Sequence, residues 1–189
     1  LYNAEGVAQG GEFRVNTTTE SQQLDPVIAG LADGGFVVSW ASNLQDGSGY
    51  GVYAQRYDAS VVAQGGEIPV NSYTIGDQSG PSISALASGG FVVTWASDGQ
   101  DGDSSGVYAQ RFDANGATVG SEFLVNTEIV NIQNQSVVTE LANGDLVFSW
   151  RSQYQDGGLG GVYAQRFDSD GVAQSTEFRV NTTVAESQR

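Results

Sequence analysis

The sequence predicts an all-β protein whose tandem four-stranded antiparallel repeats pack as the blades of a β-propeller. Two observations lead to this prediction. Marker residues recur at a spacing of 55, as Trp40, Trp95 and Trp150 do, and a fixed period of this size is typical of repeat architectures. No segment shows the 3.6-residue hydrophobic period of a helix, whereas short β-branched and aromatic runs alternate with turns drawn from the 26 glycines.

The repeats follow one another without insertion or deletion. Three motifs keep the same register: Val-Asn-Thr/Ser begins at Val15, Val70, Val125 and Val180, Gln-Asp-Gly at Gln45, Gln100 and Gln155, and Gly-Val-Tyr-Ala-Gln-Arg at Gly51, Gly106 and Gly161. This register predicts the end of a preceding repeat at 1–17, three repeats at 18–72, 73–127 and 128–182, and the start of a following repeat at 183–189.

Four short strands are expected in each repeat, and the second repeat illustrates them. Residues 81–86 alternate in polarity after Pro81, which suits the first residue of a strand. Residues 87–90 form a glycine-containing turn, and 91–95 form an apolar second strand. A polar loop then leads to a third strand at 107–112, and a turn at 113–116 leads to a fourth strand around 122–125.

A propeller blade fits this plan better than its rivals. A small β-sandwich usually needs about seven strands, and a turn of a β-solenoid is usually shorter than these repeats. Closed propellers hold about 4 to 8 blades, so three repeats make only part of a ring. We therefore expect the terminal repeats to be covered by further repeats of the parent protein or by another copy of the same chain.

Composition restricts the chemistry. All seven cationic residues are Arg, the net charge is -15, and the chain contains no His, Cys or Lys. Catalytic triads, Schiff bases and imidazole or thiolate metal sites are therefore excluded. Carboxylate chemistry, an oxygen-ligated hard cation and binding without chemistry stay open. The negative charge disfavours nucleic acid and anionic membranes as partners, and no apolar stretch is long enough to insert into a membrane.

One loop offers a candidate cation site. Asp98, Asp101 and Asp103 follow the second strand of the second repeat, and calcium takes about 6 to 8 oxygen ligands. The alternative is that Gln-Asp-Gly is a turn in which the Asp accepts hydrogen bonds from its own backbone. Calcium is thus the one cofactor that the sequence suggests.

Two further repeated residue types favour structural roles. Each Trp ends an apolar strand, which indicates core packing rather than a platform for stacking sugars. The arginines precede an Asp by two residues and are followed by a Glu in the next strand, which indicates ion pairs rather than an anion site. These sets are Arg56, Arg111 and Arg166, Asp58, Asp113 and Asp168, and Glu67, Glu122 and Glu177.

The motifs carry a family resemblance. Leu-Ala-Asp-Gly-Gly-Phe-Val-Val-Ser-Trp at 31–40, Gln-Asp-Gly-Ser-Gly at 45–49 and Gly-Val-Tyr-Ala-Gln-Arg-Tyr-Asp at 51–58 resemble the tandem repeats of very large secreted and cell-surface bacterial proteins. Those proteins are similar to RTX-type adhesins. The resemblance implies an extracellular or cell-surface location and an adhesive role, and it supplies no catalytic motif.

Two functional hypotheses follow. The first is a non-catalytic structural or adhesive module, not an enzyme, that presents an acidic β surface. The alternative is a carbohydrate-binding, lectin-like or glycan-cleaving propeller. Cleavage normally needs two carboxylates about 5 to 9.5 Å apart, and near-identical repeats are expected to offer no unique pair. Glycans are accordingly the second class of partner that we consider, besides further repeats.

Overall fold

The computed structural model describes residues 2–183, which form three four-stranded antiparallel sheets. The sheets follow the repeats, and residues 184–189 of the predicted following repeat lie outside the described part. Blade 1 contains β1 (Gln23–Gly30), β2 (Phe36–Asn43), β3 (Tyr50–Tyr57) and β4 (Ala63–Pro69). Blade 2 contains β5 (Gln78–Ala85), β6 (Phe91–Asp98), β7 (Ser105–Phe112) and β8 (Thr118–Leu124). Blade 3 contains β9 (Gln133–Glu140), β10 (Leu146–Ser152), β11 (Gly161–Phe167) and β12 (Phe178–Arg179).

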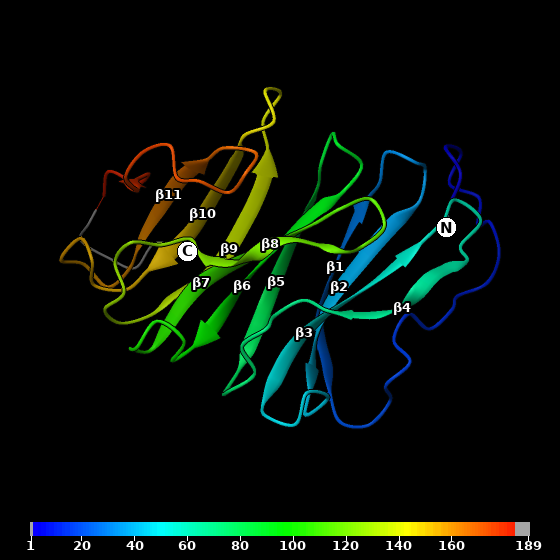
Figure 1. Ribbon diagram of the computed structural model, residues 1–189, viewed down its shortest axis with the longest axis horizontal. Coiled ribbons are helices and arrows are strands. Elements are labelled where there is room, and N and C mark those ends of the chain that lie inside the picture. The colour runs from blue at the N-terminus through cyan, green and yellow to red at the C-terminus, as the bar shows by residue number, and fades with distance from the viewer. Residues whose placement is uncertain (1, 184–189) are drawn as a thin grey trace.

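The sheets stand side by side like the blades of a propeller, which confirms the predicted fold class (Figure 1). Within each sheet the strands run in chain order. The first strands of neighbouring sheets contact one another, so β1, β5 and β9 form the inner edge of the array. No helix in the described part of the chain is long and apolar enough to cross a membrane.

Apolar residues on both faces of the strands hold the blades together. Val37 and Val52 of blade 1 pack against Phe91 and Trp95 of blade 2, and all four are fully buried. The same arrangement joins blades 2 and 3, where Val92 and Val107 meet Phe148 and Trp150. Each blade therefore presents a Trp face to the preceding blade and a Val face to the following one.

The tryptophans occupy the core, as predicted. The exposed fractions of Trp40, Trp95 and Trp150 are 3%, 0% and 1%. The three residues lie at equivalent places on the Trp faces, so they are not available to stack against a sugar.

The inner strands depart from the predicted boundaries. In blade 2 the strand begins at Gln78, and Pro81 lies inside it, at a register shift between Ser79 and Ser82. A bulge of this kind tolerates proline because the ladder is already interrupted there. The bulge residue has positive φ in every repeat: 51° at Asp25, 60° at Gly80 and 55° at Gln135.

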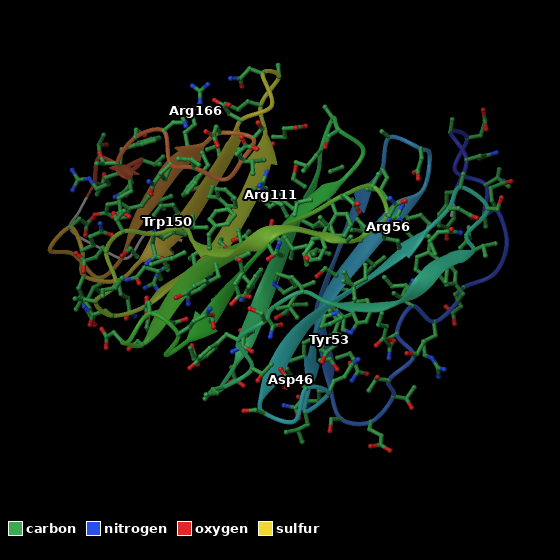
Figure 2. The ribbon with its side chains drawn as sticks, viewed as in Figure 1. Asp46, Tyr53, Arg56, Arg111, Trp150 and Arg166 are labelled. Atoms are coloured by element: carbon green, nitrogen blue, oxygen red, sulfur yellow. The ribbon has the colours of Figure 1, made fainter. Side chains whose placement is uncertain are left out.

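The repeated arginines form ion pairs, but the predicted partners are wrong. Arg56 lies 3.7 Å from Asp33, Arg111 lies 4.0 Å from Asp170, and Arg166 Nε donates to Asp145 at 2.6 Å. The three arginines lie along one side of the array (Figure 2). The Asp two residues after each Arg instead accepts hydrogen bonds within its own turn, as Asp113 Oδ1 does from the N–H groups of Asn115 and Ala117. The hydrogen bonds of this Asp within its turn form without ordering a long Arg side chain. They are therefore favoured over the predicted Arg–Asp ion pair.

The repeated glutamates connect neighbouring blades. Glu122 of β8 accepts a hydrogen bond from the Ser72 N–H of the preceding repeat at 2.6 Å, and Glu177 accepts one from the Thr127 N–H at 2.7 Å. Glu67 accepts the equivalent bond from the Thr17 N–H. Each Glu thus anchors the Val-Asn-Thr/Ser segment of the repeat before it.

Candidate functional site

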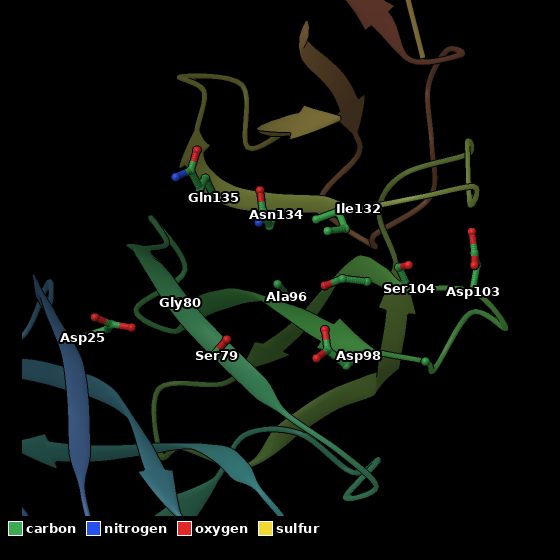
Figure 3. Close-up of a pocket in the computed structure, with 12 residues that line it drawn as sticks. Asp25, Ser79, Gly80, Ala96, Asp98, Asp103, Ser104, Ile132, Asn134 and Gln135 are labelled. Atoms are coloured by element: carbon green, nitrogen blue, oxygen red, sulfur yellow. The ribbon is translucent and has the colours of Figure 1, made fainter. Parts of the chain in front are cut away.

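A pocket of about 720 Å³ opens at the inner edge of the array, where blades 2 and 3 meet and β1 approaches (Figure 3). The inner strands line it with their bulge residues Asp25, Gly80 and Gln135 and with Ser79 and Asn134. The end of β6 supplies Asp98, and the loop that follows it supplies Asp103.

The bulges direct non-glycine residues into this pocket at a conformational cost. Asp25 and Gln135 adopt the left-handed backbone conformation, which L-residues with a Cβ rarely adopt. In repeat 2 the same position is Gly80, for which this conformation costs little.

The pocket carries negative charge. Asp25 and Asp98 are exposed on its wall, and no Arg belongs to the lining. Asp103 Oδ2 accepts a hydrogen bond from the Asn131 N–H at 2.6 Å, which fixes its orientation. Asn134 Oδ1 is buried and has no hydrogen-bond partner within the described residues. The carboxylates of Asp25 and Asp98 offer acceptors to a ligand that is rich in hydroxyl donors.

The predicted calcium ligands separate into two environments. Asp98 and Asp103 line the pocket, whereas Asp101 does not. Asp101 Oδ1 accepts a hydrogen bond from the Asp103 N–H at 3.2 Å, and its Oδ2 is buried near Gly106. In the described part of the chain no three Asp or Glu side chains form a group able to hold a metal ion. The structure does not bring the three carboxylates to one point, and calcium binding stays a prediction.

The Gln-Asp-Gly segment is a turn in each repeat, which agrees with the alternative interpretation. Asp46 and Asp156 repeat the bond of Asp101, accepting from the N–H two residues on at 3.1 Å and 3.0 Å. The carboxylate of the turn also affects the pKa of a tyrosine in the neighbouring strand. Burial, together with the charges of Asp101 and Glu122, raises the pKa of Tyr108 to about 12, so its hydroxyl stays protonated at neutral pH.

Of the three acidic pocket residues, the sequence analysis named Asp98 and Asp103 but missed Asp25. All three occupy positions that vary between repeats: Asp25 corresponds to Gly80 and Gln135, Asp98 to Asn43 and Gln153, and Asp103 to Ser48 and Gly158. A comparison of the repeats position by position would have singled out Asp25 as well. That Asp25 lines the same pocket as Asp98 and Asp103 required the three-dimensional structure.

Comparisons with known proteins agree with the fold. No protein-family model and no curated protein matches the chain. An endo-arabinase from Bacteroides thetaiotaomicron matches 83% of the chain with a TM-score of 0.54 and 16% identity. An alpha-L-arabinofuranosidase from Lactobacillus brevis matches 85% with a TM-score of 0.53 and 12% identity. An N-acetylgalactosamine deacetylase from F. plautii, in complex with blood group B trisaccharide, matches 88% with a TM-score of 0.52 and 14% identity.

This chain covers 61%, 55% and 54% of those three structures, respectively. At such identities the likeness shows a shared fold. It also contradicts the sequence-based prediction that the chain is not an enzyme, because proteins named as enzymes have this arrangement of sheets. The repeats do supply unique carboxylates, since Asp25, Asp98 and Asp103 have no acidic counterpart in the other repeats.

Proposed function

We propose that the chain is part of a glycan-recognising β-propeller and that the inner-edge pocket binds a saccharide. The observation that carries the proposal is that Asp25, Asp98 and Asp103, which have no acidic counterpart in the other repeats, all line one pocket. Carboxylate and amide oxygens suit the hydroxyl groups of a sugar, and the absence of Arg from the lining disfavours an anionic ligand.

The comparisons support the same class of ligand. The three similar structures are named as acting on arabinose-containing or N-acetylgalactosamine-containing compounds, and one of them holds a trisaccharide. The chain spans little more than half the length of each. The activity, substrate and partners of the whole protein are therefore part of the proposal, as are the extracellular location and adhesive role that the repeat resemblance implies.

Glycan-array screening followed by calorimetric titration of the best ligand tests the binding proposal. We expect Asp25→Asn and Asp98→Asn each to weaken binding about tenfold, because a hydrogen bond to a charged group contributes about 1.5–3 kcal/mol. Glu5→Gln removes the same charge on an exposed residue outside the pocket and serves as the matched control. A chain that binds no glycan, or whose binding is unchanged in both pocket variants, contradicts the proposal.

Glycoside cleavage is the second candidate, favoured by several carboxylates in a pocket of a chain whose composition leaves carboxylates as its acid and base groups. Chromogenic aryl glycosides of the sugars found on the array would report it. An Asp25→Asn or Asp98→Asn variant that keeps ligand affinity but loses hydrolysis would assign catalysis to that carboxylate. Binding without turnover would leave the lectin-like function.

A further inference from the structure

A second hollow, of about 230 Å³, lies beside blade 3. The link that leads from blade 2 into β9 forms one wall, and the loop between β10 and β11 forms the other. The lining residues are Glu128, Val130, Asn131, Gln153, Tyr154 and Gln155. One aromatic ring and several amide and carboxyl groups therefore line the same hollow.

Tyr154 supplies the aromatic ring of this hollow. It is 53% exposed, and its ring packs on no other ring within residues 2–183. Its φ of 60° lies in the left-handed region, and the equivalent residue of repeat 2 is Gly99, with a φ of 72°. Asn131, with a φ of 65°, likewise stands where repeat 2 has Gly76, with a φ of 75°. Because the fold accepts glycine at both positions, it does not require either side chain.

Contact between blades does not cover this position. In blade 1, which blade 2 follows, the equivalent Leu44 is 57% exposed and has a φ of 63°. The link to the following blade donates hydrogen bonds to Ser48 in blade 1 and to Asp103 in blade 2, each four residues beyond this position. A blade packed behind blade 3 in the same way would reach Gly158 and leave Tyr154 accessible.

The groups around the ring suit a sugar. A tyrosine ring presents a broad apolar face with partial negative charge, against which the C–H groups of a sugar ring stack. Glu128 Oε1 accepts a hydrogen bond from the Val130 N–H at 3.0 Å, and its Oε2 accepts none within the described residues. The side chains of Asn131 and Gln153 are partly buried, and their amides both donate and accept. A molecule with hydroxyl groups on an apolar ring needs this combination of contacts.

A single peptide separates the hollow from the inner-edge pocket. Asn131 lines the hollow, whereas Ile132 lines the pocket (Figure 3). The Asn131 N–H donates to Asp103 of the pocket at 2.6 Å, and the Ile132 carbonyl accepts the N–H of Gln153, which lines the hollow, at 2.9 Å. From Asn131 to Asn134 of the pocket, the chain spans roughly 10 Å at most. A monosaccharide occupies one of the two sites, whereas a short oligosaccharide is long enough to enter both.

We propose, on the basis of the glycan-binding function above, that the ligand is an oligosaccharide rather than a single sugar. One unit occupies the inner-edge pocket, and a second unit stacks on Tyr154. Between them the ligand crosses the peptide that joins Asn131 to Ile132. Because the other repeats have Leu44 and Gly99 in place of the tyrosine, this subsite belongs to blade 3 and not to the repeat in general.

Calorimetric titration with sugars of graded length tests the inference. The probes are the sugar that the glycan array selects, used as the monosaccharide and as its short oligomers. We expect affinity to rise from the monosaccharide to the di- or trisaccharide and then to level off. Asp25→Asn should weaken the binding of every member of the series. Tyr154→Leu should weaken the oligomers about two- to tenfold, the range expected for the loss of an aromatic contact, and leave the monosaccharide unchanged.

The other repeats supply the matched variants. Tyr154→Leu copies repeat 1, and Tyr154→Gly copies repeat 2 and relieves the left-handed backbone. Tyr154→Gly should therefore fold at least as stably as the wild type and still lose oligomer affinity, an outcome that a merely structural role of the ring does not give. Tyr154→Phe keeps the ring and should keep most of the affinity. Leu44→Gly relieves the same conformation in blade 1 and, as the control, should leave binding unchanged.

Two results would overturn the inference and leave the proposed function intact. One is oligomer affinity that is unchanged in both Tyr154→Leu and Tyr154→Gly, with circular dichroism confirming that the variants fold. The other is a monosaccharide that binds as tightly as its oligomers. A chain that binds no glycan on the array contradicts the proposed function itself and the inference with it.

Discussion

The Gln-Asp-Gly turns pack against a glycine of the following strand, and no larger residue fits there. In each repeat the buried Oδ2 of the turn Asp faces the first Gly of the Gly-Val-Tyr-Ala-Gln-Arg motif. A Cβ at Gly51 would lie 2.6 Å from Asp46 Oδ2, and a Cβ at Gly161 would lie 2.7 Å from Asp156 Oδ2. The Asp and the Gly recur together because the carboxylate occupies the space in which a side chain would stand.

Gly51→Ala should therefore destabilise the protein by about 1–3 kcal/mol, the usual cost of overpacking a filled site. Urea unfolding followed by tryptophan fluorescence measures this change. Gly66→Ala is the matched control, because a Cβ there meets no atom within 4 Å. The double variant Asp46→Ser/Gly51→Ala should recover part of the loss, since the shorter side chain vacates the space. Equal effects of Gly51→Ala and Gly66→Ala would contradict the explanation.

The glutamate on each fourth strand connects elements of different repeats. Burial works against the charge of Glu67, but hydrogen bonds from the Thr17 N–H and the Gln45 side chain outweigh it and lower the pKa of this carboxyl below its ordinary value of 4.5. The bonded partners belong to the preceding segment and to the Gln-Asp-Gly turn. The ionised carboxylate of Glu67 thus connects β4 with the preceding segment and with the Gln-Asp-Gly turn.

A lowered pKa in the folded state means that the ionised form stabilises the fold. That contribution is present above the ordinary value of 4.5 and is lost as the pH falls through the lower folded value. Glu67→Gln should reduce the free energy of unfolding at neutral pH and should lose less stability than the wild type on acidification. Denaturant unfolding at several pH values measures both effects, with Glu5→Gln as control. If the free energy of unfolding depends on pH in the same way for Glu67→Gln and the wild type, the charge of Glu67 does not stabilise the fold.

The charge of -15 acts on the molecule as a whole. Four ion pairs occur between described side chains, so most carboxylates are not paired with a cation. Self-repulsion among them opposes compaction, and dissolved salt screens it over a Debye length of about 10 Å at 0.1 M.

Thermal stability should consequently rise with salt. We expect NaCl and KCl to raise the Tm equally, because screening depends on ionic strength and not on the identity of the cation. CaCl2 at matched ionic strength tests the calcium prediction in the same experiment: a further rise that chelator reverses, and that Asp98→Asn or Asp103→Asn reduces, would support a specific site. A Tm that does not respond to NaCl would contradict the repulsion argument.

Local patterns were enough to predict the blades. The 55-residue register, the β-branched second strand and the position of each Trp follow from side-chain chemistry that repeats in every copy, and the structure places these residues as expected. The partners of Arg56, Arg111 and Arg166 were not predictable in the same way. Arg56 and Arg166 pair with an Asp in a turn of their own blade, whereas Arg111 pairs with an Asp in a turn of the next blade. A spacing of two residues carries no information about either turn.

The sequence by itself determined the all-β fold class, the 55-residue period and the restriction to carboxylate chemistry, because each depends on composition or on periodicity along the chain. Only the tertiary structure decided that Asp25, far from the predicted loop in sequence, shares a pocket with Asp98 and Asp103 while Asp101 does not. The reason is that the angle between blades sets which residues of different repeats meet, and that angle arises from packing summed over whole faces rather than from any local motif.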